Sequence, residues 1–165
     1  MSFTRVIDAL KPRRTAHAHC DVPCGIYDPA TAQLAARTVS RMVELLDGLP
    51  VGGALEDRNK FIRCIAVKEQ HAEQVKRDVQ VIWSDYFKPE HLAQFPELHD
   101  LTWKILKQAG KCKQSVDVAA AADLEVQVAR FAEIFWATKN APVHTMKPSA
   151  DGAQKNVIAW EVRAA

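Results

Sequence analysis

The feature that most constrains the fold is a series of long stretches in which apolar side chains return every three or four residues. An α-helix has 3.6 residues per turn, so this spacing gathers the apolar side chains on one face. The first stretch covers about 29–47 and includes Leu34, Val39, Met42, Val43 and Leu46. Asp28 and Pro29 precede it, as a capping side chain and a proline suited to the first helical turn. We therefore expect an amphipathic helix here.

Three similar stretches follow, separated by short segments that contain proline or glycine. The second runs from about 57 to 85, the third is interrupted by Pro96 and ends near Gly110, and the fourth covers about 116–138. The residues of the second stretch that are expected to face inward are Phe61, Ile65, Ala72, Val75, Val79 and Ile82. Short connections place successive helices side by side in opposite directions, which predicts an all-α fold, an antiparallel four-helix bundle. The tail 140–165 is expected to be a flexible arm or a short strand around 157–160.

Length and charge limit the classes of protein to consider. The 165 residues suffice for one domain, and no apolar run approaches the roughly 18 residues that cross a bilayer. The formal charge of +2 is concentrated in residues 1–18, which carry four basic side chains and one acidic one. Without them the chain is nearly neutral, so we expect neither a nucleic-acid partner nor a membrane partner.

Residues 1–18 form a basic leader that ends in Ala16-His17-Ala18. Its longest apolar stretches are the pairs Val6-Ile7 and Ala9-Leu10, whereas a secretory signal needs a run of roughly 7–15. The leader is therefore not a typical secretory signal, and we expect a cytoplasmic protein. Two interpretations of the leader stay open, a disordered tail and a propeptide that is removed, and the residues after it favour the propeptide.

A loop directly after the leader holds His19, Cys20 and Cys24. Two thiolates and an imidazole so close together form a plausible metal site. A lone C-x3-C is a weak signal, because a redox pair or two ordinary loop cysteines give the same pattern. The other cysteines, Cys64 and Cys112, are isolated in the sequence and are expected to be small hydrophobic side chains.

The motif becomes more specific if His19 is the first residue of the chain. A free amine at His19, the next amide nitrogen and the Cys20 sulfur would then form two fused five-membered chelate rings. The Cys24 sulfur can close a square plane of two nitrogens and two sulfurs, a geometry that suits Ni(II) or Cu(II) rather than zinc. An acylated nitrogen is not an amine, so this arrangement requires cleavage between Ala18 and His19.

The residues after the leader resemble the mature N-terminus of nickel superoxide dismutases, known as the nickel hook. The hook-like segment is His19-Cys20-Asp21-Val22-Pro23-Cys24-Gly25-Ile26-Tyr27-Asp28-Pro29. Further matches are Lys68-Glu69-Gln70, Trp83-Ser84-Asp85-Tyr86-Phe87-Lys88-Pro89, Pro96-Glu97-Leu98-His99 and Ile134-Phe135-Trp136-Ala137-Thr138-Lys139. The resemblance thus covers about 19–139. It divides the chain into a propeptide, 1–18, a bundle domain, 19–139, and a C-terminal tail, 140–165.

The resemblance implies a superoxide dismutase that converts two superoxide ions into dioxygen and hydrogen peroxide with a nickel ion. It implies that His19, Cys20 and Cys24 bind the nickel and that Asp21 and Tyr27 line the substrate approach. It also implies a cis peptide bond before Pro23, a homohexamer, and a protease that removes the propeptide.

Two positions depart from the family pattern. Relatives carry a glutamate where this chain has Ala35 and an arginine where it has His71, a pair that supports the axial imidazole. We expect an altered support, with His71 itself as a candidate to reach the hook. The connector 50–56 and the tail also exceed those of shorter relatives. The residues at positions 35 and 71 are the only sequence feature that favours one rival, a non-catalytic nickel or copper trafficking protein that uses the same hook. A second rival, a helical structural protein with an accidental motif, does not explain the matches that extend to residue 139.

Overall fold

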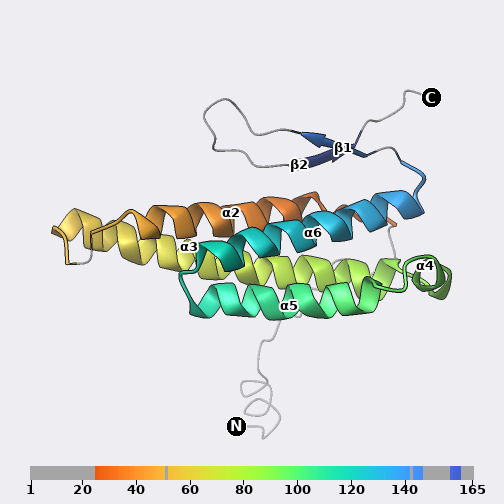
Figure 1. Cartoon of the computed structure of the whole chain (residues 1–165), viewed down its shortest axis with the longest axis horizontal. Helices are drawn as coiled ribbons and strands as arrows, with labels where there is room; N and C mark the ends of the chain where they lie inside the picture. Colours follow the sequence, from red (N-terminus) through yellow and green to blue (C-terminus); the bar gives the residue numbers. More distant parts are fainter. Residues whose placement is uncertain (1–24, 51, 142, 147–156, 161–165) are drawn as a thin grey trace, which may run out of the picture.

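The four predicted helical stretches form an antiparallel bundle in the computed structural model, which describes residues 25–50, 52–141, 143–146 and 157–160 (Figure 1). Its long helices are α2 (Ala30–Asp47), α3 (Leu55–Val81), α5 (Leu98–Gln114) and α6 (Val118–Thr138). Helix α2 packs against α3 and α6, and α5 packs against the same two helices, so the four close into a ring. The predicted architecture is confirmed.

The α2–α3 hairpin is longer than the rest of the bundle. Helix α3 has 27 residues and α5 has 17, which at 1.5 Å per residue makes α3 about 15 Å longer. The connection between α2 and α3 consequently extends beyond α5 and α6 at one end of the molecule (Figure 1). We call residues 42–64, which form this extension, the projection.

Helix α3 ends in a π-helical turn, η1 (Ile82–Tyr86), at the end of the bundle opposite the projection. The amide of Phe87 donates to the carbonyl oxygen of Ile82, 3.3 Å away, and closes this wider turn. Pro89 then begins the short helix α4 (Pro89–Gln94), which was not predicted as a separate element. A π-helical turn inserts one extra residue and changes the direction of the side chains at its end, here Tyr86.

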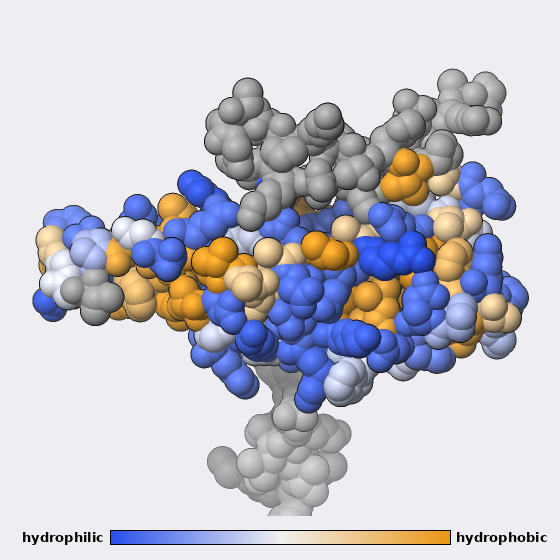
Figure 2. Space-filling model, in the orientation of Figure 1, coloured by the Kyte–Doolittle hydropathy of each residue, from blue (hydrophilic) through white to orange (hydrophobic). Residues whose placement is uncertain are grey.

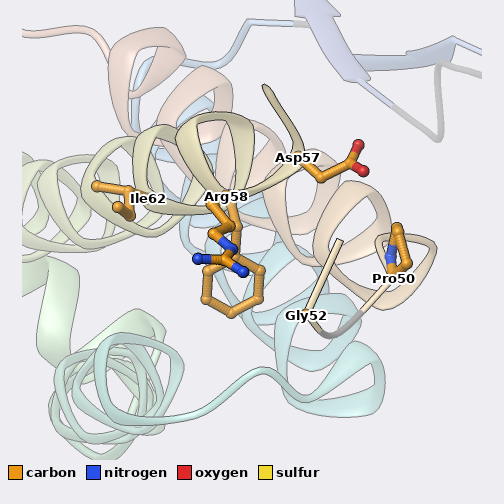
Figure 3. A pocket seen from close by; sticks show the side chains of 6 residues that line it. Pro50, Gly52, Asp57, Arg58 and Ile62 are labelled. Carbon is orange, nitrogen blue, oxygen red and sulfur yellow. The ribbon is translucent and has the colours of Figure 1, made fainter. Parts of the chain in front are cut away.

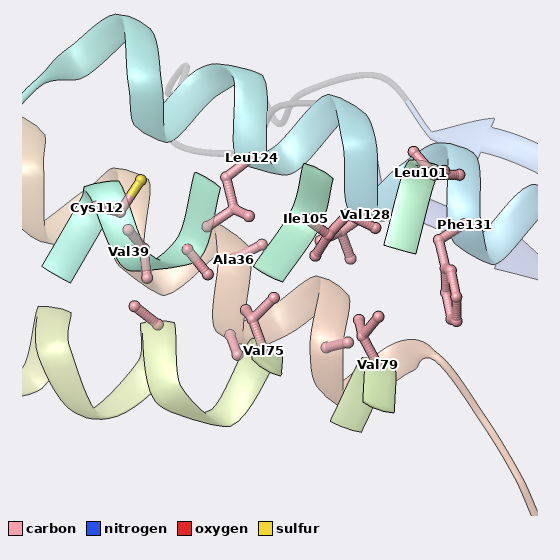
Figure 4. Close-up of a cluster of buried hydrophobic side chains, with 14 of the residues drawn as sticks. Ala36, Val39, Val75, Val79, Leu101, Ile105, Cys112, Leu124, Val128 and Phe131 are labelled. Atoms are coloured by element: carbon pink, nitrogen blue, oxygen red, sulfur yellow. The ribbon is translucent and has the colours of Figure 1, made fainter. Parts of the chain in front are cut away.

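The core is built from small and medium apolar side chains on the facing sides of the four helices (Figure 4). Fully buried members include Ala35, Val39, Val75, Val79, Ile105, Leu124, Val128, Phe131 and Phe135. Alanine and valine dominate α2 and α3, and this lets the two helices approach closely. Leucine and phenylalanine fill the wider space beside α5 and α6.

One lysine is part of this interior. Lys68 is 1% exposed, and its ammonium group donates to the carbonyl oxygens of Cys112, Lys113 and Ser115 at 2.6, 2.9 and 2.7 Å. These carbonyls lie at the C-terminal end of α5, where a helix leaves acceptors without partners and carries partial negative charge. Burial lowers the pKa of Lys68. The lysine therefore joins α3 to the end of α5.

The helical spacings and apolar neighbours of Trp83, Trp103 and Trp136 predict core positions, but not all of these residues are buried. Trp103 is 59% exposed and Trp83 is 37% exposed, with the Trp83 indole N–H donating to Nδ1 of His99 at 2.9 Å. Leu34 and Phe61, expected on inward faces, are exposed as well. Their spacing is helical, but each is offset from the buried stripe of its helix. Trp136 is buried, as predicted.

The C-terminal tail forms a two-stranded antiparallel hairpin, β1 (Val143–Met146) and β2 (Val157–Trp160). Val143 pairs with Trp160 and Met146 with Val157, and β2 also contacts α6 (Figure 1). The predicted strand at 157–160 therefore exists, and its partner belongs to the same chain. In the described part of the chain, no helix combines the length and the apolar character that a membrane crossing requires.

Candidate metal centre and its aromatic surroundings

The predicted nickel ligands and Asp21 lie outside the described residues, as does the peptide bond before Pro23. The description begins one residue after Cys24, with Gly25 at a φ of +71°. L-residues with side chains rarely adopt this left-handed backbone conformation, and no atom of the described residues would obstruct a Cβ at this position. The glycine is needed for its backbone conformation, which sets the direction in which the chain leaves Cys24.

The chain is fixed to the bundle a few residues later. The Asp28 carboxylate accepts a hydrogen bond of 2.8 Å from the amide of Ala30, and Gln33 donates to the carbonyl oxygen of Pro29 at 3.0 Å. These bonds satisfy amides of the first turn of α2. The predicted cap is confirmed, although Pro29 immediately precedes the helix. Tyr27 is thereby held at the end of the bundle formed by η1, α4 and the C-terminus of α6.

Tyr27 faces Tyr86, with ring centroids 5.7 Å apart. Tyr86 also contacts Phe87, His91 and Phe135, at centroid distances of 5.2, 5.6 and 4.6 Å. We call these five residues the aromatic cluster. They come from the start of α2, from η1 and α4, and from α6, so the bundle brings together residues far apart in sequence. From the sequence, Tyr86 and Phe87 are expected to be packing residues, and the contact with Tyr27 adds Tyr86 to the candidate site.

Two lysines lie at the aromatic cluster. The ammonium group of Lys139 is 5.1 Å from the centroid of Tyr86 and 5.0 Å from that of Phe135, distances at which a cation is attracted to an aromatic face. Lys88 is exposed and precedes α4, where its amide donates to Nδ1 of His91 at 3.2 Å. Their positive charges favour the approach of a small anion to this end of the bundle.

A small cavity of about 60 Å³ lies beside Tyr27, between the start of α2 and the end of α3. Asp78 lines it, and one oxygen of this carboxylate is buried without a hydrogen-bond partner among the described residues. A space of this size accommodates one or two water molecules and nothing larger.

Two larger hollows lie on the projection. They are separated from Tyr27 by about the length of α2, roughly 27 Å. One, of about 370 Å³, is lined by Pro50, Gly52, Asp57, Arg58, Phe61 and Ile62 (Figure 3). The other, of about 230 Å³, is lined by Met42, Leu45, Asn59, Lys60, Arg63, Cys64 and Val67. Both are distant from the aromatic cluster, and their walls are largely apolar, which is unsuited to binding a metal ion.

The part of the chain that the structure describes offers no alternative site for a metal ion. The described residues contain no group of three or more His, Cys, Asp or Glu side chains able to hold a metal. Cys64 and Cys112 are buried free thiols, and burial raises the pKa of Cys112, which keeps that thiol protonated at neutral pH. The remaining cysteines, Cys20 and Cys24, with His19, form a sulfur and nitrogen donor set that fits nickel.

The two departures from the family pattern lie on α2 and α3. Ala35 is fully buried in the core. His71 is half-buried, and its Nδ1 lies 2.8 Å from the carbonyl oxygen of Val67, one turn earlier in α3. A carbonyl only accepts, so Nδ1 carries a proton, and in the neutral ring Nε2 is the atom free to accept a hydrogen bond. The expected contact between His71 and the hook stays a prediction, because the hook lies outside the described residues.

Comparison with known proteins gives one consistent result. Residues 14–139 match the family model described as nickel-containing superoxide dismutase. A superoxide dismutase [Ni] of Streptomyces coelicolor is 42% identical over 130 residues, which cover 79% of this chain and 95% of that protein. The corresponding protein of Streptomyces seoulensis is 40% identical over 130 residues, which cover the same shares of the two chains. A native nickel superoxide dismutase structure aligns with a TM-score of 0.66 at 41% identity, covering 73% of this chain and 99% of that one.

Proposed function

This chain belongs to the nickel-containing superoxide dismutase family and is an enzyme that removes superoxide with nickel, and we propose that His19, Cys20 and Cys24 hold the metal. The observation that carries the proposal is the donor inventory. Among the described residues no cluster can bind a metal, both described cysteines are buried free thiols, and the two other cysteines of the chain lie in the hook. Nothing in the comparisons favours the rival interpretation as a non-catalytic trafficking protein.

Nickel held by two thiolates and nitrogen donors supplies a one-electron couple, Ni(II)/Ni(III), by which one superoxide is oxidised to dioxygen and another is reduced, with two protons, to hydrogen peroxide. In the proposal, the His19 amine and imidazole, the Cys20 amide nitrogen and sulfur, and the Cys24 sulfur are the donors. Asp21 and Tyr27 line the substrate approach. Tyr27 is supported in this role by its position three residues after Cys24, in contact with the aromatic cluster.

Lys88 and Lys139 are proposed to attract the superoxide anion toward this end of the bundle. Lys139 is held over Tyr86 and Phe135, and Lys88 is exposed at the start of α4. Positive charge near the entrance raises the local concentration of an anionic substrate, and the effect weakens as salt is added. The two lysines are thus proposed to act on encounter with superoxide rather than on its chemistry.

Removal of residues 1–18 is proposed to generate the active form, with a protease as processing partner. The bundle domain then starts at His19, and 140–165 is a C-terminal extension. The proposal is supported by the chemistry of the terminal amine and by the family match, which starts at residue 14, before His19. A cytoplasmic location and assembly into a homohexamer are proposed together with it. Large exposed apolar side chains such as Leu34, Leu55 and Ile62 support an assembly.

Three forms of the protein test the proposed site, starting at Met1, at Ala18 and at His19. One extra residue turns the His19 amine into an amide and moves the free amine three atoms further along the chain. We expect only the form that starts at His19 to retain nickel and remove superoxide, while all three show the same helicity by circular dichroism. Nickel content and superoxide decay are measured side by side. Full activity of the Met1 form would mean that the terminal amine is not a ligand.

A second pair of variants tests the thiolates. Serine at Cys20 or Cys24 replaces a soft thiolate by a poorly ionised hydroxyl, so nickel retention and activity should both be lost. The matched control is Cys64→Ser, at a buried thiol outside the hook, which should keep its nickel. A Cys24→Ser protein with near-normal nickel content and activity would contradict the proposed ligand set.

A further inference from the structure

The hydroxyl group of Tyr86 is one member of a hydrogen-bond chain at the C-terminal end of α6. The Thr138 hydroxyl donates to the carbonyl oxygen of Phe135 at 2.6 Å, and the Tyr86 hydroxyl oxygen is 2.7 Å from the Thr138 oxygen. Thr138 is the last residue of α6, and Tyr86 is the last residue of η1. The hydrogen bonds therefore link two elements that are separated by more than fifty residues of sequence.

The Phe135 carbonyl group ends this hydrogen-bond chain and determines the direction in which both hydroxyl protons point. A carbonyl oxygen only accepts, and a hydroxyl group has a single proton. At 2.6 Å from the Phe135 oxygen, the Thr138 proton must point to that oxygen, because two oxygens this close without a proton between them would repel each other. Thr138 therefore accepts from Tyr86. The Tyr86 proton is committed to Thr138, and the Tyr86 oxygen can only accept further hydrogen bonds.

The ring of Tyr86 is fixed as firmly as its hydroxyl group. Phe135 lies 4.6 Å away, His91 stacks nearly parallel to it at 5.6 Å, and the Lys139 ammonium is 5.1 Å from its centroid. These contacts leave little freedom for the ring to turn and aim its hydroxyl elsewhere. Tyr27 packs against the same ring. The side of the ring toward Tyr27 is, on the proposed function, the side that faces the substrate approach.

We propose that Thr138 is a positioning residue that forces the Tyr86 hydroxyl to act only as a hydrogen-bond acceptor toward any molecule that reaches it beside Tyr27. An acceptor binds the O–H groups of water and of hydrogen peroxide, and it offers no proton to an anion. Tyr86 thus favours neutral, proton-bearing molecules at this point and does not retain superoxide or other small anions. Without Thr138 the hydroxyl proton is released to bind an anion. This inference rests on the proposed function only in placing the approach beside Tyr27.

Tyrosine Raman spectroscopy tests the hydroxyl direction without any need for activity. The chain has two tyrosines, so the tyrosine doublet in the Raman spectrum of a Tyr27→Phe protein comes from Tyr86 alone. The intensity ratio of this doublet reports whether the hydroxyl donates or accepts. We expect a strong donor signature in Tyr27→Phe and in Tyr27→Phe/Thr138→Ser. We expect its loss in Tyr27→Phe/Thr138→Val. A signature unchanged by valine would overturn the inference.

Kinetics of the nickel-loaded protein starting at His19 provides the functional test. Thr138→Val should strengthen inhibition by azide about 3- to 10-fold, the size of one neutral hydrogen bond, and Thr138→Ser should not. In a Tyr86→Phe background, Thr138→Val should change inhibition by less than about 2-fold, because the hydroxyl through which it acts is gone. An equal effect of Thr138→Val in both backgrounds would show that Thr138 acts by another route.

Thr102→Val is the matched control. Thr102 is a buried threonine on α5 whose hydroxyl has no partner among the described residues, so the change removes the same atoms away from the aromatic cluster. It should leave both the Raman signature and azide inhibition unchanged. If the unmodified protein starting at His19 does not remove superoxide, the proposed function fails. The Raman comparison still decides the role of Thr138 in that case, because it requires neither nickel nor turnover.

Discussion

Lys68 shows how a single residue can be misread from a correct pattern. Residues 68, 72, 75, 79 and 82 follow the helical spacing that predicts the buried face of α3, but Lys68 was not among the residues predicted to face inward. In the structure Lys68 follows the pattern and is buried. Sequence alone does not show the reason, which is the end of α5, 44 residues later, whose carbonyls accept the lysine protons.

The stability of the bundle should depend strongly on Lys68. Lys68→Met keeps the length of the side chain but leaves three carbonyls at the end of α5 without their donor. We expect the free energy of unfolding to fall by about 3 kcal/mol, at the upper end for loss of a buried polar partner. Urea denaturation monitored by circular dichroism measures the change. The control Lys104→Met, which removes an exposed ion pair with Asp100, should change stability by less than about 1 kcal/mol.

Ala35 and His71 occupy the positions at which the resemblance implies a paired glutamate and arginine, and the burial of Ala35 refines what restoring those residues should do. Glutamate at the fully buried position 35 would place an unpaired carboxylate in the core, so Ala35→Glu alone should destabilise the bundle by about 3 kcal/mol or more. Adding His71→Arg should recover part of this loss. Urea denaturation of the two single variants and the double variant measures the coupling. A neutral Ala35→Glu would show that the site opens to solvent.

His71 can also be tested by itself. If its Nε2 supports the axial imidazole, His71→Ala should reduce superoxide turnover by roughly 10- to 100-fold, the range typical for groups that support metal ligands. Nickel content should fall less than activity, because the ligands themselves remain. Unchanged kinetics would show that the bond between His71 and Val67 only anchors the ring to its own helix.

At the scale of elements, the predicted helices agree with the structure where local sequence determines their ends. Helix α2 begins after Asp28 and Pro29 and ends at Asp47, within one residue of the prediction. The π-helical turn η1 was not foreseen, because it depends on tertiary contacts of Tyr86 with Tyr27 and Phe135. The pairing of β1 with β2 was not predicted either, because two four-residue strands carry little periodic signal.

The connection between α5 and α6 should make the stability of the bundle sensitive to acid. The Asp117 carboxylate accepts from the amide of Ala120, and this bond and the ion pair with Lys111 lower its pKa. Lys113 likewise lowers the pKa of Glu73. A carboxyl whose pKa is lowered by folding stabilises the protein above its ordinary pKa, roughly 4, and loses that contribution as the pH falls through the lowered value.

We therefore expect the melting temperature to be level from about pH 7 to pH 5 and to fall below about pH 4. Asp117→Asn keeps a capping oxygen for Ala120 but has no charge to titrate, so its decline in acid should be shallower than that of the unmodified protein. Melting curves followed by circular dichroism between pH 3 and pH 7 give the comparison. Parallel pH profiles of the two proteins would show that Asp117 does not contribute to the loss of stability in acid.

At the scale of the whole molecule, the projection is the part that most resembles an interface. Leu55 and Ile62 are 77% and 67% exposed, and Phe61 lies between the two in α3. Apolar side chains gather at this end of the molecule, beside the two larger hollows (Figure 2). Contiguous apolar surface of this kind usually marks a contact with another protein. We predict that the projection carries one of the contacts of the proposed assembly.

The prediction is tested by adding a charge to this surface. Ile62→Glu should shift the protein toward smaller species in size-exclusion chromatography with light scattering, because an unpaired charge would be buried at the contact. Val116→Glu adds the same charge at another exposed apolar residue, in the connection between α5 and α6, and should leave the assembly size unchanged. An unchanged assembly in Ile62→Glu would place the contacts elsewhere.

The site also depends on the order in which the chain is made. The aromatic cluster combines Tyr27 from the beginning of the described chain, Tyr86 from the middle and Phe135 from the last helix, followed by Thr138. During synthesis the hook leaves the ribosome after the leader and before any of the helices, and α6 emerges last of the helices. An unfinished chain can thus expose the cysteines of the hook long before their surroundings exist. A leader that keeps the His19 amine blocked until α6 has docked would delay metal capture until the bundle is complete.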